Sequence, residues 1–189
     1  MIEILAGYIA VVLLIIVVLV AVSIFNRLIS LKNNVDKAWA NIEVLLKQRS
    51  DLVPNLVATV KGYAKYEQSL LKKITELRTS IVSGANIKEL AKNSDALSSS
   101  LKTVFSIAES YPTLQASNNF VELQKELTEI EDMIADRREF YNDSVLLFNT
   151  HIHSFPDMFL AGTLKMTDME YFKATEDEKK LVSVNAQIN

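Results

Sequence analysis

An uncharged apolar run extends from Ile4 to Phe25 and covers 22 positions, ILAGYIAVVLLIIVVLVAVSIF. At about 1.5 Å rise per residue, a helix of this length spans about 33 Å, which matches a bilayer hydrocarbon core of about 30 Å. A cleaved signal peptide is the weaker alternative, because the run is too long and Glu3 precedes it where a basic start is expected. The sequence therefore predicts one N-terminal transmembrane helix, with residues 1–25 as a separate segment.

The charges beside the run set the expected orientation. Arg27, Lys32 and Lys37 follow it, whereas no Lys or Arg precedes it. The positive-inside rule then places the following domain in the cytoplasm. We expect a single-pass protein of the cell membrane whose main domain, residues 26–156, lies at the cytoplasmic surface.

Composition excludes several classes of function. The chain has no cysteine, so disulfides, thiolate nucleophiles and cysteine-bound metals are excluded. The formal net charge is −3, and no cluster of excess Lys and Arg indicates a nucleic-acid surface. The sequence contains no phosphate-binding loop, nucleophile elbow or dinucleotide fingerprint. We expect no enzymatic activity and no cofactor.

The candidate metal ligands do not form a predicted site. His151 and His153 are two positions apart, so on a helix they face opposite sides and cannot share a metal. An acidic stretch lacks the glycine-containing pattern of a calcium loop and is interpreted as a solvated face. Its members are Glu129, Glu131, Asp132 and Asp136.

Apolar residues recur at steps of three and four after the span, which is typical of long packed helices. The first such seam consists of Leu28, Leu31, Val35, Ala38, Ile42, Leu45, Arg49, Leu52 and Leu56. Pro54 lies inside this seam and predicts a kink or a break near Val53. The seam is expected to resume through Tyr63 and to end at Ser83-Gly84 with a left-handed cap.

Two further helices are expected, at residues 86–110 and 119–155, joined by a short loop at residues 113–117. Short connections imply antiparallel neighbours. The predicted fold is therefore all-α, a long antiparallel, up-and-down helical bundle with an N-terminal single-pass transmembrane helix. The apolar residues of 157–189 are irregular and predict a strap on the bundle followed by a frayed terminus.

Arg49 and Arg137 occupy seam positions where apolar residues are expected. Either each extends its charged end to solvent from a partly open groove, or both belong to a buried polar layer that fixes helix register. The other candidates for this layer or interface are Asp51, Asn55, Tyr141, Asn142 and Asn149. A catalytic role is not expected, because no nucleophile or base partner accompanies these residues.

Aromatic residues recur at every seventh position in the last predicted helix, at Tyr141, Phe148 and Phe155. This spacing predicts a stripe of core residues, with a ligand groove as the alternative. Trp39 stands between two alanines, about 21 Å beyond the run if the helix is straight, so we expect it to pack between helices.

The region from Asn34 to Glu67 resembles the hallmark segment of the LemA family of small membrane proteins. Its matching residues include Ala38-Trp39, Arg49, Asp51-Leu52-Val53-Pro54-Asn55 and Lys61-Gly62-Tyr63. A second block resembles the family as well, including Glu109, Tyr111-Pro112, Glu131, Arg138, Tyr141-Asn142, Phe148-Asn149 and Phe155-Pro156. One departure is Tyr66, where the family more often has histidine.

The resemblance implies an N-terminal anchor, an antiparallel helical bundle and no established enzymatic activity. A relative with this architecture takes part in building magnetosome membranes, which implies a membrane-organising role. We expect a membrane-anchored scaffold or adaptor that organises protein partners or copies of itself in contact with the lipid bilayer. The alternative is a regulatory or sensory module in which a ligand enters the polar layer.

Overall fold

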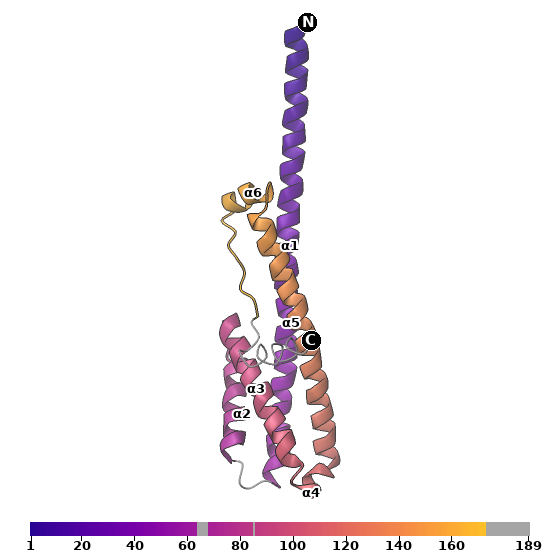
Figure 1. Cartoon of the computed structure of the whole chain (residues 1–189), viewed down its shortest axis with the longest axis vertical. Coiled ribbons are helices and arrows are strands. Elements are labelled where there is room, and N and C mark those ends of the chain that lie inside the picture. The colour runs from indigo at the N-terminus through magenta and orange to yellow at the C-terminus, as the bar shows by residue number, and fades with distance from the viewer. Residues whose placement is uncertain (64–67, 85, 173–189) are drawn as a thin grey trace, which may run out of the picture. The chain divides into compact units, whose positions relative to one another are not determined.

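The computed structural model describes residues 1–63, 68–84 and 86–172, and within these ranges the protein is helical with no strand. The all-α prediction is confirmed for these residues. The helices are α1 (Ile2–Lys61), α2 (Gln68–Val82), α3 (Ile87–Ala108), α4 (Pro112–Gln115), α5 (Asn118–His153) and α6 (Asp157–Thr163) (Figure 1).

The chain divides into two compact units. Unit 1 contains Met1–Ala38 and Tyr141–Met169, and unit 2 contains Trp39–Phe140 and the described residues from Glu170 on. Helices α1 and α5 each contribute to both units. The expected boundaries after residues 25 and 156 stay predictions.

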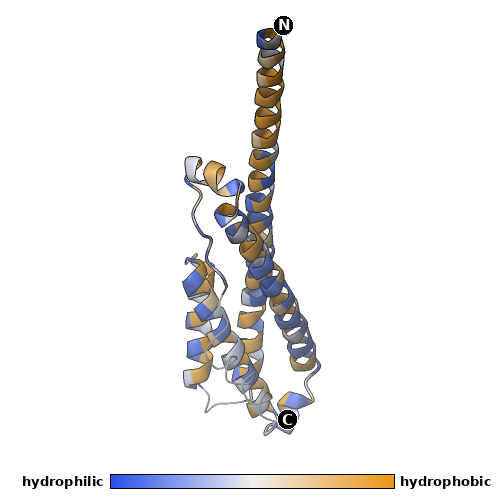
Figure 2. Cartoon of the chain, turned by 45° about the horizontal axis from the view of Figure 1, so that its top comes forward, coloured by the Kyte–Doolittle hydropathy of each residue, from blue (hydrophilic) through white to orange (hydrophobic). Residues whose placement is uncertain are grey.

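The apolar run is the first part of α1, and it is the orange N-terminal stretch in Figure 2. Every described side chain from residue 3 to residue 23 is exposed. By length and composition, α1 is long and apolar enough to cross a membrane. Burial begins at Ile24, which is 8% exposed, and continues along the predicted seam as far as Leu56, with only Leu52 partly exposed.

Helix α1 continues without interruption through Pro54, so the predicted break near Val53 is wrong, while the kink stays a prediction. The interruption comes later, after Lys61, where the N–H of Tyr63 donates to the carbonyl of Val60 over 3.0 Å. Tyr63 is 43% exposed, so the seam does not continue through it. Gly62, rather than Pro54, follows the end of this helix.

Helices α2 and α3 pack on each other within unit 2. Between them, Gly84 has a φ of +75°, which confirms the predicted left-handed cap after α2. The side chain of Asn86 accepts a hydrogen bond from the N–H of Glu89 over 2.9 Å and so caps the start of α3. The positions that step by three and four along α3 are buried from Leu90 to Ala108.

Two segments without predicted helix are helical. The expected loop at residues 113–117 overlaps α4, a single turn that has proline at its first position and buries Leu114. The expected strap begins with α6, because Asp157 and Ala161 bury one side of a short helix. Residues 164–172 follow without helix, and the predicted frayed terminus lies outside the described residues.

Candidate functional site

A fully buried charged group lies in unit 2, the guanidinium of Arg49 on α1, whose side chain is 0% exposed. Its Nη1 donates to Ser98 Oγ over 2.8 Å, and its Nη2 donates to Ser94 Oγ over 2.8 Å. Nη1 also forms an ion pair and hydrogen bond with Glu131 Oε1. We name Arg49, Ser94, Ser98 and Glu131 the Arg49 cluster; it joins α1, α3 and α5.

Hydrogen bonding within the Arg49 cluster is nearly complete. Ser98 Oγ donates to the second carboxylate oxygen of Glu131 over 2.6 Å, so both oxygens of Glu131 have partners. Burial lowers the pKa of Arg49, and the neighbouring Glu131 carboxylate opposes this effect. Among the buried side-chain nitrogens and oxygens of this cluster, Nε of Arg49 alone has no hydrogen-bond partner. The cluster therefore links three helices and leaves no free base or nucleophile.

A second ion pair links α3 and α5 in unit 2. Arg138 Nη2 pairs with Asp95 Oδ1, and both side chains are largely buried. The Arg138 guanidinium also lies 4.3 Å from the ring centroid of Phe172, a cation–π geometry. Phe172 in turn contacts Trp39, with ring centroids 6.0 Å apart. Trp39 therefore packs against an aromatic ring, and residue 172 is held on the helices.

The predicted polar-layer residues differ in burial. Arg49 is fully buried as the layer hypothesis requires, but Asp51 and Arg137 are exposed. After Ile134, the next inward-facing position of α5 comes four residues later instead of three. Arg138 therefore faces the interior, and Arg137 faces solvent. Asp51 and Arg137 therefore do not form a buried layer with Arg49. Their exposure agrees with the alternative in which the charged end reaches solvent, and a role at an interface stays a prediction.

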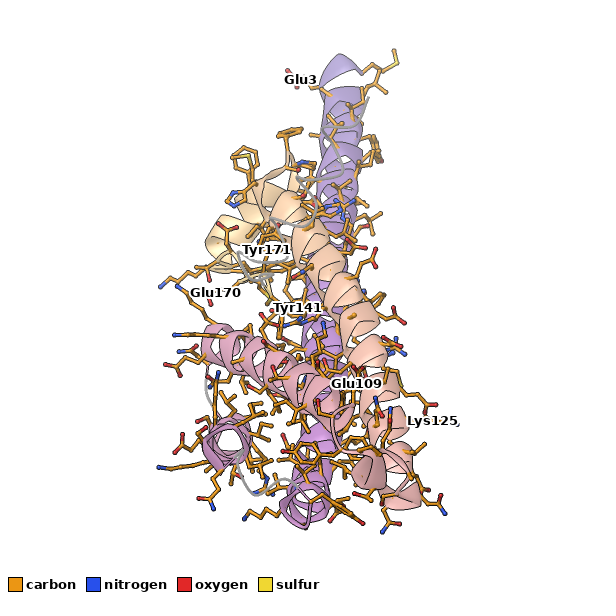
Figure 3. The ribbon with its side chains drawn as sticks, turned by 60° about the horizontal axis from the view of Figure 1, so that its bottom comes forward. Glu3, Glu109, Lys125, Tyr141, Glu170 and Tyr171 are labelled. Atoms are coloured by element: carbon orange, nitrogen blue, oxygen red, sulfur yellow. The ribbon has the colours of Figure 1, made fainter. Side chains whose placement is uncertain are left out.

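Two open grooves in unit 2 contain the remaining α1 candidates. Asp51 lines a groove of about 340 Å³ formed with α2 and the start of α3. Asn55, which is exposed, lines a groove of about 380 Å³ together with acidic residues of α5, Glu122 and Glu126. Near this groove, Lys125 points outward from α5 (Figure 3). Neither groove reaches the Arg49 cluster residues.

The other candidates lie on α5 in unit 1. Tyr141 and Phe148 are each 1% exposed, in keeping with the predicted core stripe, but Phe155 is 79% exposed and lies outside it. Asn142 is half-buried. The side-chain amide of Asn149 donates to the carbonyl of Met169 over 3.0 Å, and its oxygen accepts from the N–H of Met169 over 2.9 Å. Asn149 therefore holds the strap by its backbone.

The histidines contact different carboxylates in unit 1. His151 Nδ1 lies 2.8 Å from Asp157 Oδ2, and His153 Nε2 lies 2.8 Å from Asp168 Oδ1. Asp157 is 1% exposed and also forms an ion pair with Arg27. Asp157 is thus the charged centre of a second cluster, which joins α1, α5 and α6.

The sequence pattern did not predict that Glu131, Arg138 and Asp157 form ion pairs between helices. Glu131 was interpreted as part of a solvated acidic face, whereas it pairs with Arg49. One signal was available, because Glu131 and Arg138 are seven residues apart and therefore share a face of α5. Both also belong to the residues that carry the family resemblance.

Comparisons with known proteins bear on identity. The LemA family profile matches residues 38–185. Magnetosome protein MamQ 2 of Paramagnetospirillum magneticum is 25% identical over 175 residues, which is 79% of this chain and 64% of that protein. Magnetosome protein MamQ of Magnetospirillum gryphiswaldense is 24% identical over 174 residues, with coverage of 78% and 64%. Protein LemA of Metamycoplasma hominis is 27% identical over 158 residues, with coverage of 82% and 71%.

The chain spans less than two thirds of the length of the magnetosome relatives. Neither the family description nor the names of these relatives denote an enzyme. The resemblance seen in the sequence is confirmed, because the profile match contains Arg49, Glu131 and Arg138 and covers more than half of the chain. The chain belongs to the LemA family.

Proposed function

We propose that this protein is a membrane-anchored scaffold or adaptor without enzymatic activity. The observation that carries the proposal is the complete exposure of the described side chains from residue 3 to residue 23. Burying one Val, Leu or Ile side chain stabilises a protein by about 1.5–3 kcal/mol. No other described part of this chain covers the side chains of the run. A bilayer supplies the apolar surroundings that the run requires.

The proposed arrangement is a single span with the helical domain on the cytoplasmic side. The excess of Lys and Arg after the run supports this orientation. Short connections, such as that from Ser83 to Asn86, support an antiparallel, up-and-down bundle.

A scaffold needs fixed helices, and the ion pairs of unit 2 support that role. Arg49 of α1 is bound by polar groups of two other helices, α3 and α5, and Arg138 is bound by Asp95 and stacked on Phe172. The alternative of a ligand-responsive layer is less well supported, because Asp51 and Arg137 lie outside the interior.

The proposed partners are other copies of this chain or other membrane proteins. Met133 and Phe140 on α5 are 43% and 52% exposed, and seven-residue spacing places them on one helix face. Such a pair favours contact with another helix. The relatives named as magnetosome proteins support a role in organising a membrane compartment.

Single-cysteine cross-linking tests this proposal, because the chain has no cysteine of its own. Met133→Cys and Ala135→Cys would each be introduced into the full-length protein in its native membrane; residue 135 is also exposed but lies about 200° around the helix. We expect a covalent product from residue 133 and little from residue 135. Mass photometry after gentle extraction would then distinguish copies of the chain from a foreign partner. A strictly monomeric protein without either product would refute the proposal.

A further inference from the structure

Large apolar side chains are exposed around α6 in unit 1. Phe155 is 79% exposed, Phe159 is 66% exposed and Met158 is 46% exposed. The rings of Phe155 and Phe159 contact each other edge to face, with centroids 5.9 Å apart. Three such side chains within five consecutive positions form a patch, which we name the Phe155 patch, and such patches mark interaction sites more often than scattered residues do.

The Phe155 patch is fixed next to the end of the apolar run. In the sequence, Asp157 lies between Phe155 and Met158. Its side chain is 1% exposed and forms an ion pair with Arg27. Arg27 is two residues after Phe25, the last residue of the run, which is about 3 Å along the helix axis. Figure 1 shows α6 beside α1 in this part of unit 1.

The burial of α1 supports the same placement. Ile24 belongs to the apolar run but is only 8% exposed, whereas the described side chains from residue 3 to residue 23 are all exposed. Folded parts of the protein therefore extend to the last turn of the run. If the run spans a bilayer, this turn lies at the boundary between acyl chains and headgroups.

The charges around the patch suit that boundary. The carboxylate of Asp157 has both Arg27 and His151 as partners, so it does not present an unpaired negative charge to lipid. The Arg27 side chain is 48% exposed, which leaves its polar end able to reach lipid phosphates. Phenylalanine and methionine gain from leaving water, and short apolar-faced helices lie in this interfacial region.

We propose that the Phe155 patch is a second membrane contact, in which Phe155, Met158 and Phe159 insert into the interfacial region of the bilayer beside the span. This inference rests on the proposed transmembrane run. The occupant is lipid and not a second copy of the chain, because the ion pair to Arg27 holds the patch at the level where the bilayer begins.

Depth-dependent quenching in the full-length protein tests the proposal. Phe159→Cys would be labelled with an environment-sensitive fluorophore and reconstituted into phosphatidylcholine and phosphatidylglycerol vesicles. Quenchers would be attached either to the lipid headgroup or deep in the acyl chain. Leu14→Cys reports the middle of the run, and Asp143→Cys, an exposed residue of α5 in unit 1, is the control outside the membrane. Met158→Cys gives a second report on the patch.

We expect labels at residues 158 and 159 to lose most of their fluorescence to quenchers on the lipid headgroup. The label at residue 14 should lose its fluorescence to quenchers deep in the acyl chain. The label at residue 143 should be quenched by neither. If residue 14 is quenched while residues 158 and 159 behave like residue 143, the membrane contact is refuted and the span is retained. If residue 14 is not quenched, the proposed span fails, and the inference fails with it.

Discussion

The Nε of Arg78 donates a hydrogen bond to the backbone carbonyl of Ser50 over 3.3 Å. In an α-helix this carbonyl accepts from the residue four positions later, which here is Pro54 and has no N–H. Arg78, from α2, therefore supplies the donor that α1 lacks at this point. This contact gives a physical reason why α1 continues through a proline.

The first prediction concerns this replaced donor. Arg78→Met should lower the free energy of unfolding by about 1 kcal/mol, because it leaves the Ser50 carbonyl without its donor. Pro54→Ala should raise it by about 1–3 kcal/mol, because alanine restores the helical N–H and removes the ring clash. In the Pro54→Ala background, Arg78→Met should cost less than it does alone.

Thermal unfolding of the full-length protein in detergent, followed by circular dichroism, measures this coupling. Additive effects of the two substitutions would contradict the assigned role of Arg78. Arg137→Met is a matched control, because Arg137 is exposed and the structure assigns it no role in the interior.

The second prediction concerns the ion pair of the Arg49 cluster. Glu131→Leu should lower the free energy of unfolding by about 3–5 kcal/mol, because it leaves the fully buried Arg49 guanidinium without a counter-charge. Arg49→Met should cost less, since the Glu131 side chain is 26% exposed and can be solvated. The double variant Arg49→Met, Glu131→Leu should recover most of the loss. Denaturant unfolding curves of the three variants test this order, and a double variant that is less stable than Glu131→Leu alone would exclude it.

The third prediction concerns the link between Asn149 and Met169. Asn149→Asp retains the acceptor for the Met169 N–H but loses the donor to the Met169 carbonyl, and it sets a carboxylate against that carbonyl. We expect a cost of about 1–3 kcal/mol and faster hydrogen exchange at Met169. Hydrogen-exchange mass spectrometry measures this change, with Thr150→Ala at the adjacent exposed position as the control. Unchanged protection at residue 169 would show that the two hydrogen bonds do not hold the strap.

The fourth prediction compares two glycines. Gly84 has a φ of +75°, so Gly84→Ala should cost about 1–2 kcal/mol through backbone strain alone. At Gly62, an added Cβ would meet only the Thr59 carbonyl oxygen at 3.5 Å, an ordinary contact. Gly62→Ala should therefore be near neutral. Melting temperatures of the two variants test the pair, and equal losses would contradict it.

The helical seams could be predicted from the sequence because burial itself imposes the steps of three and four. Apart from Leu52, the seam positions from Leu28 to Leu56 are buried, and so are the positions at steps of three and four from Leu90 to Ala108. At a charged position the same pattern is ambiguous by one residue. From Ile134, a step of three leads to Arg137 and a step of four leads to Arg138, and only the position of Asp95 on α3 favours the second.

The remaining differences come from contacts between distant residues and from short elements. The donor for the Ser50 carbonyl is 28 positions away. A local rule for proline therefore predicted a kink or a break, and the break does not occur. In the sequence, Glu131 cannot be distinguished from the other acidic residues of its helix. Its ion pair with Arg49 depends on the packing of α1 against α5. Helix α6 has only seven residues, which is too short for a periodic pattern to stand out.

The pairing of Asn149 with Met169 involves only the backbone of residue 169. The contact therefore does not depend on which side chain residue 169 carries, and substitutions there should be tolerated as far as this contact is concerned. Proline is the exception, because it has no N–H to donate to the Asn149 oxygen. Among variants of this chain, position 169 should thus exclude proline, while position 149 should accept few replacements.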